Sequence, residues 1–310
     1  MNALDELVGM LSDPFMQRAL IAAVLVGVTA PVMGTYLVQR KLSLLGDGIG
    51  HVALTGVALG WLVGGAMGVV PNDALAIPGA VVAAVIGSVV IELVRERGRT
   101  SGDVALALMF YGGIAGGVLL IGVAGGSSGN LMQYLFGSIS SVSPTDLWLT
   151  LFLGALILAV GMGLRAALFA VSYDEEFSRA SGLPVRALNI AIAVIAALTV
   201  TVAMRVVGLL LVSALMIVPV AIAQLVTVSF RRTMALAMAI GVVVCVVGLS
   251  VTYWQTLSPG ATIVVLAIAL YAVVAILRPV LLRRKPRVSH DPHPDIPDDV
   301  HVEGGERCSA

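Results

Sequence analysis

Residues Leu20 to Val38 read LIAAVLVGVTAPVMGTYLV, a continuous run without a charged side chain. An α-helix needs about 20 predominantly apolar residues to cross the hydrocarbon core of a bilayer, and this stretch has that length. Its apolar residues do not alternate with polar ones as they do along a strand of a membrane β-barrel. We therefore predict a transmembrane helix, because a helix satisfies its backbone hydrogen bonds within the segment.

The composition of the whole chain agrees with a membrane protein. Of its 310 residues, 59% are hydrophobic and 12% are charged, and the mean hydropathy is +1.03. A soluble domain carries about 25% charged residues, so this chain cannot cover itself with a polar surface. The 18 basic residues balance 18 acidic ones, which argues against nucleic acid as a partner. The two cysteines, Cys245 and Cys308, predict neither a disulfide framework nor a zinc ribbon.

Nine segments are apolar and long enough to span a bilayer. We predict an all-α, polytopic integral membrane protein with about nine transmembrane helices. Arg205 interrupts the longest apolar stretch, so eight or ten helices also remain open. The segments are Leu20 to Val38, Val52 to Val70, Ala74 to Val94, Val104 to Ala124, Leu147 to Val171, Ala187 to Ala203, Val206 to Val228, Met234 to Val251 and Ala261 to Leu282.

The basic residues predict the orientation. Their clusters fall at alternate ends of successive segments, so all of them can lie in the cytoplasm. The chain then divides into an extracytoplasmic N-terminal segment (1–14), a transmembrane domain (15–282) and a disordered cytoplasmic tail (283–310). The acidic start, without Lys or Arg, is unlike a cleavable signal peptide. The tail holds three histidines beside several acids, which leaves weak metal binding or a plain solvated role open: His290, His293 and His301.

After its basic start, the sequence RKLSLLGDGIGH, which ends at His51, holds one acid and one histidine. Asp47 and His51 are four residues apart, so on a helix they share one face. Ionisable groups at membrane depth are costly and usually serve transport, and a carboxylate with an imidazole suits zinc or manganese. A two-fold dimer would bring two of each together and supply four ligands. The alternative is structural, with Asp47 as a helix cap and His51 bonded to a backbone carbonyl.

The longest charged loop between segments reads YDEEFSRASGLP over residues 173–184. We predict a short amphipathic helix with Asp174, Glu175 and Glu176 in its first turn, where acidic side chains favour the helix dipole. Gly182 is a typical signal for the end of such a helix. A docking element for a soluble partner and an ordinary connecting loop are the two interpretations.

Motifs for catalysis are missing from the sequence, which has no Walker phosphate loop, no G-x-S-x-G and no H-E-x-x-H. We therefore expect a transport subunit, not an enzyme, without a permanently bound cofactor. If transport consumes energy, another chain or an ion gradient supplies it.

Four stretches together resemble the permease subunits of ATP-binding-cassette (ABC) importers for zinc, manganese and iron(II), closest to the zinc-uptake permeases. They are Arg40 to Gly60, Asn130 to Leu147, Tyr173 to Val185 and Met204 to Ala223. The resemblance runs from about residue 15 to 282, with the stretches in the family's order.

The resemblance implies a multi-pass permease of the bacterial plasma membrane that pairs with a second copy. It also implies a pair of cytoplasmic ATP-binding subunits, which hydrolyse ATP, and an extracytoplasmic metal-binding protein. Asp47 and His51 would line the path of the metal, with zinc favoured over manganese and iron(II). One departure weakens zinc: some zinc permeases carry a further histidine in the fourth span, where this chain has Phe110 and Tyr111. The implied ATPase-coupling loop comprises Tyr173, Asp174, Glu175, Glu176, Phe177 and Gly182.

Three rival functions remain at this stage. A gradient-driven secondary metal transporter would work without an ATPase, but the sequence shows no convincing internal duplication. An importer of a metal chelate needs a wide path without ionic ligands, which the Asp47 and His51 pair argues against. A membrane scaffold would use both residues structurally.

Overall fold

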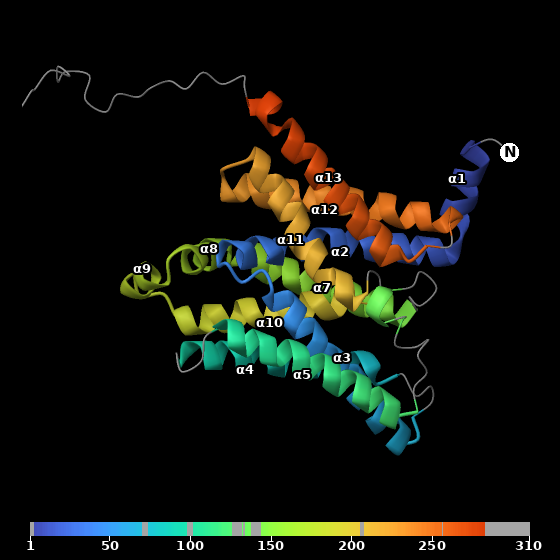
Figure 1. Cartoon of the computed structure of the whole chain (residues 1–310), viewed down its shortest axis with the longest axis horizontal. Coiled ribbons are helices and arrows are strands. Elements are labelled where there is room, and N and C mark those ends of the chain that lie inside the picture. Colours follow the sequence, from blue (N-terminus) through green and yellow to red (C-terminus); the bar gives the residue numbers. More distant parts are fainter. Residues whose placement is uncertain are drawn as a thin grey trace, which may run out of the picture.

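The computed structural model describes residues 3–69, 74–97, 102–125, 132, 134–137, 144–204, 208–255 and 257–282. The regular secondary structure in these ranges consists of α-helices. In Figure 1, α4 and α5 lie along one side of the bundle and α12 and α13 along the other, with α2 and α10 between them. The bounds are α1 (Ala3–Ser12), α2 (Pro14–Gln39), α3 (Leu45–Ala66), α4 (Ala76–Glu96), α5 (Gly102–Val123), α7 (Pro144–Gly163), α8 (Arg165–Tyr173), α9 (Glu175–Ala180), α10 (Val185–Ala203), α11 (Leu209–Val226), α12 (Phe230–Trp254) and α13 (Pro259–Leu282).

The lengths of these helices match the predicted spans. Seven are long and apolar enough to cross a membrane, and α7 with α8 adds an eighth if the bent pair is one span. α11 is a shorter apolar helix. Within the described ranges, each predicted segment corresponds to one of these helices or to the bent pair, so the polytopic helical fold is confirmed. Arg205 and the tail (283–310) lie outside the described residues.

The predicted span from Leu147 to Val171 is bent. α7 ends at Gly163 and α8 begins at Arg165, with an angle of 68° between them. Gly161 and Gly163 stand beside the bend, and glycine weakens a helix. The Tyr36 hydroxyl of α2 donates a hydrogen bond to the Gly161 carbonyl, which belongs to the last turn of α7, where carbonyls lack partners along the helix. Hydropathy alone cannot predict this bend, because both arms are apolar.

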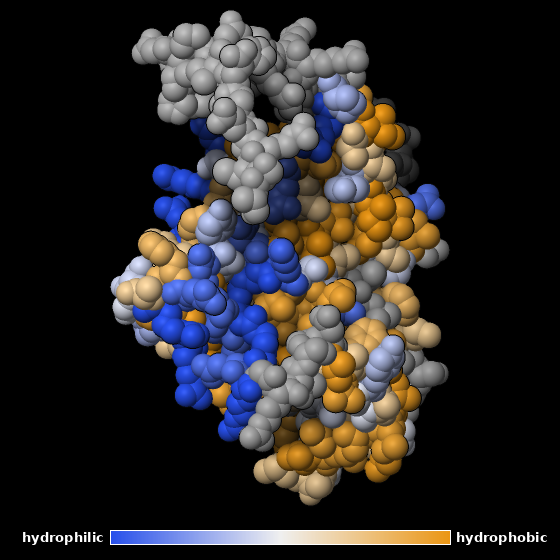
Figure 2. Space-filling view, turned by 60° about the vertical axis from the view of Figure 1, so that its left-hand side comes forward, coloured by the Kyte–Doolittle hydropathy of each residue, from blue (hydrophilic) through white to orange (hydrophobic). Residues whose placement is uncertain are grey.

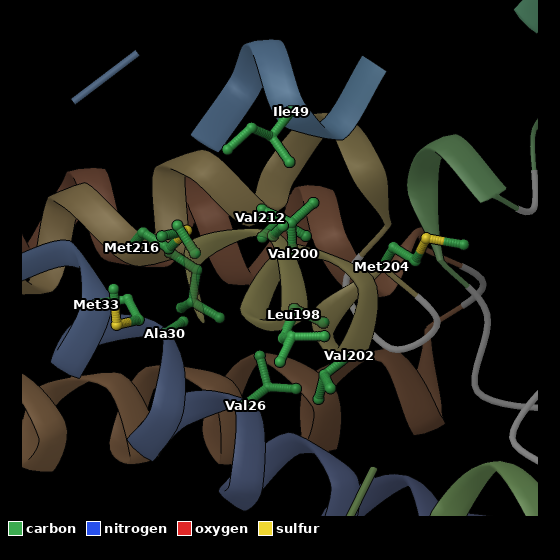
Figure 3. Close-up of a cluster of buried hydrophobic side chains, with 14 of the residues drawn as sticks. Val26, Ala30, Met33, Ile49, Leu198, Val200, Val202, Met204, Val212 and Met216 are labelled. Atoms are coloured by element: carbon green, nitrogen blue, oxygen red, sulfur yellow. The ribbon is translucent and has the colours of Figure 1, made fainter. Parts of the chain in front are cut away.

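The core of the bundle forms around α2 and α10. In each of these helices, 72% of the apolar window is buried, against 22% in α5 and 17% in α13. Close packing depends on small residues, as is usual between membrane helices. A Cβ atom on Gly34 of α2 would collide with the backbone of Met216 in α11. Figure 3 shows the buried cluster where α2 and α10 meet α3 and α11, with Val26, Ala30, Met33, Ile49, Leu198, Val200, Val202, Met204, Val212 and Met216 labelled.

The two ends of the bundle differ in chemistry. α9 lies at one end with the last turns of α2 and α4 and the first turn of α10, and hydrophilic side chains gather over it (Figures 1 and 2). α1 lies at the opposite end (Figure 1), within the N-terminal segment predicted to be extracytoplasmic. The placement of either end relative to the cytoplasm stays a prediction. We call the first the charged end, and its described residues include Arg40, Glu92, Arg95, Glu175 and Arg186.

Candidate functional site

The start of α3 positions Asp47 and His51. α2 ends at Gln39, and Lys41 follows with a left-handed φ of 57°. A short hydrogen-bonded turn then leads into α3 at Leu45. The helix begins seven residues before the predicted span, which started at Val52, because a polar stretch lowers hydropathy without preventing a helix. Asp47 therefore lies in the first turn of α3 and His51 one turn later, on the predicted common face.

Asp47 contacts both His51 and a hydroxyl from another helix. The distance from His51 Nε2 to Asp47 Oδ1 is 3.8 Å. Ser213 of α11 donates a hydrogen bond to the same oxygen, with 3.3 Å between Oγ and Oδ1. The side chain of Asp47 is 25% exposed and that of His51 only 2% exposed. The carboxylate is thus partly exposed, and the imidazole is buried.

The surroundings of His51 leave one of its ring nitrogens without a hydrogen bond among the described residues. Its Nδ1 atom is buried and has no hydrogen-bond partner within the described part of the chain, so the predicted alternative of a bond to a backbone carbonyl gains no support there. The Phe110 ring of α5 stands edge-on to the imidazole, with 4.4 Å between ring centroids. Leu44 is the N-cap of α3, so Asp47 does not serve as that cap.

The site is incomplete for a tightly held metal ion. Within the described ranges, no three His, Cys, Asp or Glu side chains come together around a possible metal. Asp47, His51 and Ser213 offer a carboxylate, an imidazole and a hydroxyl, and transition metals in proteins commonly take four to six ligands. Such a set can hold a divalent cation transiently, with water or a second chain supplying the other ligands. Ser213 was not predicted, although it is the one polar residue before Gln224 in the apolar run from Leu209.

The predicted short helix exists as α9. The Asp174 side chain caps it by accepting a hydrogen bond from the backbone amide of Phe177 at 2.9 Å. Glu175 and Glu176 occupy the first turn. The helix ends at Ala180, and Gly182 follows with a left-handed φ of 80°, as expected for a residue just after a helix.

The loop residues divide into an outward and an inward group. The side chains of Tyr173, Glu176 and Phe177 are exposed. Glu175 instead accepts hydrogen bonds from Arg40 (2.8 Å), Arg95 (3.0 Å) and Asn189 (3.1 Å), which come from the ends of α2 and α4 and from α10.

A second carboxylate extends this cluster. Glu92 of α4 pairs with Arg95 at 2.8 Å and lies 3.7 Å from Arg40. Burial and the charge of Arg95 lower the pKa of the Arg40 guanidinium, although Glu92 and Glu175 act to raise it. Burial works to raise the pKa of Glu175, but Arg95 and Arg40, with the hydrogen bonds from Arg95 and Asn189, hold it below its ordinary value. In the sequence these arginines served only as orientation signals, and Glu92 was visible as the one acid in an otherwise apolar segment.

Comparison with known proteins places the chain in a family. The sequence model of the ABC 3 transport family matches residues 12–278. The chain belongs to this family. Membership of the ABC 3 family, with seven or more apolar spans, makes the chain a multi-pass protein of a bacterial membrane and a transport component. The predicted resemblance is thereby confirmed.

Curated relatives of this ABC 3 family chain carry names of metal transport systems. The chain is 31% identical over 270 residues to "Manganese transport system membrane protein MntC" of Halalkalibacterium halodurans, covering 87% of this chain and 89% of that protein. It is 31% identical over 264 residues to "Chelated iron transport system membrane protein YfeD" of Yersinia pestis, covering 85% of each.

Solved structures agree on the fold. The structure described as "PsaBC from Streptococcus pneumoniae in complex with Fab" matches with a TM-score of 0.77 and 31% identity, covering 87% of this chain and 95% of that one. A putative metal-chelate type ABC transporter in an inward-facing conformation matches with a TM-score of 0.59 at 15% identity, and this likeness concerns the fold alone.

Proposed function

We propose that this chain is the membrane-spanning permease subunit of an ABC importer and that Asp47 and His51 lie in the path of a divalent metal ion. ATP hydrolysis then belongs to a separate pair of ATP-binding subunits at the charged end. An extracytoplasmic binding protein delivers the metal at the end that carries α1. The observation that carries the proposal is the juxtaposition of Asp47, His51 and Ser213.

The chemistry of these three groups suits reversible binding of a metal ion during transport better than permanent binding. A buried imidazole with an unpartnered nitrogen is costly unless something binds it. The carboxylate of Asp47, which is 25% exposed, can draw a cation toward the other ring nitrogen, Nε2, 3.8 Å away. Because three ligand atoms leave the coordination shell unfinished, the metal is held weakly enough to be released.

We propose manganese as the first cargo, whereas the family resemblance seen in the sequence favoured zinc. Two of the three groups are oxygen donors, which manganese accepts readily, whereas zinc prefers nitrogen and sulfur. The side of His51 toward α5 is occupied by the Phe110 ring, which has no ligand atom. The names of the curated relatives, which concern manganese and chelated iron, support the same choice.

Two copies of the chain are proposed to form the complete permease. A two-fold axis beside Asp47 would bring a second Asp47 and a second His51 to the same path. α5 and α13 are the least buried spans, with 22% and 17% of their windows inside the molecule, and they offer surface for a second copy as well as for lipid.

The docking site proposed for the ATP-binding subunits is the outward face of α9. Phe177 is 68% exposed and Tyr173 is 73% exposed, and the adjacent Glu176 is exposed as well. Aromatic side chains such as those of Tyr and Phe are enriched at protein–protein interfaces.

The test is metal uptake by proteoliposomes that contain this chain, the ATP-binding subunit and the binding protein. Manganese, zinc and iron(II) compete for uptake, with and without ATP. We expect ATP-dependent, manganese-selective uptake that is lost in the Asp47→Asn/His51→Gln double variant. Asp13→Asn is the matched control, because Asn caps α2 as well as Asp does. Full uptake by the double variant would remove both residues from the path, and uptake without ATP would overturn the importer assignment.

A further inference from the structure

We propose that Glu175 is a positioning residue that ties α9 to the turn leading into α3, so that a displacement of α9 reaches Asp47. This rests on the proposed function, because it supplies the mechanical connection that an ATP-driven permease needs. The connection has three parts: the contacts of Glu175, the burial of Arg40, and the turn between Arg40 and Asp47.

The contacts of Glu175 join four elements at one carboxylate. Its Oε1 atom lies 2.8 Å from Arg40 at the end of α2, 3.0 Å from Arg95 in the last turn of α4, and 3.1 Å from the amide of Asn189 in α10. Charge-assisted hydrogen bonds are the strong ones, and here several of them converge. α9 therefore follows the ends of these three helices as a unit.

Burial distinguishes this junction from an ordinary surface ion pair. The Arg40 side chain is 3% exposed and Glu92, its second acidic neighbour, is 5% exposed, while Glu175 itself is 37% exposed. The burial of the junction is therefore that of Arg40 and Glu92. Removing one partner of a buried pair leaves an uncompensated charge, which is strongly destabilising, whereas an exposed pair contributes little. Glu176, one residue further along, is exposed and can be changed without touching the junction.

A short hydrogen-bonded turn connects Arg40 to Asp47. The amide of Lys41 donates to the Val38 carbonyl at 3.1 Å, and the amide of Leu42 donates to Leu37 at 2.9 Å. Lys41 adopts the left-handed conformation at φ 57°, which costs about 1–2 kcal/mol for a residue with a Cβ atom and persists only where the surroundings impose it.

The far side of the turn is bonded in the same way. Leu45 donates to Leu42 at 3.0 Å, and Gly48 donates to Leu44 at 3.2 Å. Because the turn is short and held by these hydrogen bonds, a shift of Arg40 moves the first turn of α3, which carries Asp47.

The first measurement is the ratio of metal imported to ATP hydrolysed in the reconstituted complex. We expect Glu175→Gln to lower this ratio about tenfold, equivalent to about 1.4 kcal/mol of coupling, while ATP hydrolysis stays within about twofold of wild type. The matched control for this ratio is Glu96→Gln, because Glu96 is an exposed acid that pairs with Arg186 at 3.2 Å and, among the described residues, not with the junction. It is expected to keep the wild-type ratio. Glu175→Asp, which keeps the charge, should restore part of it. An unchanged ratio in Glu175→Gln would overturn the proposal.

The second measurement does not depend on transport. Spin labels at Ser181→Cys, beyond α9, and at Leu44→Cys, in the turn, report the distance between the two elements in the detergent-solubilised chain. Glu175→Gln should broaden the distance distribution and Glu176→Gln should not. Arg95→Gln, whose side chain is 27% exposed, provides a second variant if Glu175→Gln does not fold. If wild type shows no ATP-dependent uptake, the proposed function fails while these distances still decide the junction, and an unbroadened distribution in both Glu175→Gln and Arg95→Gln would refute it.

Discussion

Ser213 in α11 donates a hydrogen bond to Asp47 in α3, with 3.3 Å between Oγ and Oδ1 and 166 positions between the two residues in the chain. The bond orients the carboxylate toward the imidazole of His51. It also leaves the lone pairs of the Ser213 oxygen free to approach a cation. The cation site proposed here therefore belongs to two helices, and the register of α3 against α11 sets its geometry.

Removing this hydroxyl should weaken metal capture without unfolding the protein. A hydrogen bond contributes about 1 kcal/mol, so Ser213→Ala is expected to raise the manganese concentration for half-maximal uptake about fivefold. Ser250→Ala is the control, because that hydroxyl bonds only to a backbone carbonyl of its own helix among the described residues. Equal uptake curves for the two variants would exclude Ser213 from the site.

The closeness of α5 to α3 makes a second prediction. A Cβ atom on Gly113 would lie 2.5 Å from the carbonyl carbon of His51, whereas one on Gly112 would meet nothing within 4 Å. Gly113→Ala must therefore push α3 away, at a cost of about 1–3 kcal/mol as in other overpacked interiors. We expect lower thermal stability and lower uptake for Gly113→Ala and wild-type behaviour for Gly112→Ala. Similar melting curves for both variants would contradict the packing described here.

The junction at Glu175 predicts a defined response to acid. Its pKa lies below the ordinary value of 4.5, because Arg95 and Arg40 outweigh the effect of burial. A carboxylate with a lowered pKa contributes stability that is fully present above the unfolded-state pKa and is lost as the pH falls through the folded-state pKa. α9 should therefore stay in place down to pH 4.5 and detach only below it.

A fluorophore on Ser181→Cys can follow this detachment during a pH titration. In Glu175→Gln, the acid-dependent step should vanish, because the group that titrates is gone. Glu176→Gln should keep the step, since its carboxylate makes no contact with Arg40 or Arg95. A step already complete above pH 4.5 would contradict the assigned direction of the pKa shift.

Two glycines have left-handed backbone conformations, but within the described ranges only one of them also lies against another part of the chain. Substituting each one therefore distinguishes the cost of the backbone conformation from the cost of a steric collision. Gly182 has φ 80° and open space around it, whereas a Cβ atom on Gly208, at φ 88°, would collide with the backbone of residues 135–137. Gly182→Ala should cost about 1–2 kcal/mol from the backbone conformation alone. Gly208→Ala adds the collision and should sharply reduce the yield of folded protein in detergent. Equal yields would show that the loop before α11 adjusts easily.

Sequence reasoning succeeded where the signal is local. The apolar runs predicted the spanning helices, and the spacing of four residues correctly placed Asp47 and His51 on one face of α3. The short helix α9 followed from a stretch of acids and a glycine, although Asp174 caps this helix and does not lie in its first turn as predicted. In each case the determining interactions lie within a few residues along the chain.

The same reasoning could not separate Glu175 from Glu176. Both are acids in the first turn of one helix, yet one is bound by Arg40, Arg95 and Asn189 and the other faces outward. The difference depends on which side of α9 meets the bundle, and that side is set by how α2, α4 and α10 end beside it.

The sequence by itself determined the class of the protein, because hydrophobicity and helical period are properties of neighbouring residues. It also determined that Asp47 and His51 share one face of a helix. The tertiary structure decided that Ser213 faces Asp47, that α7 and α8 bend at 68°, and that α9 is tied to the end of α2. These features arise from side-chain packing between helices far apart in the chain, and the periodicity of one segment carries no information about its neighbours in space.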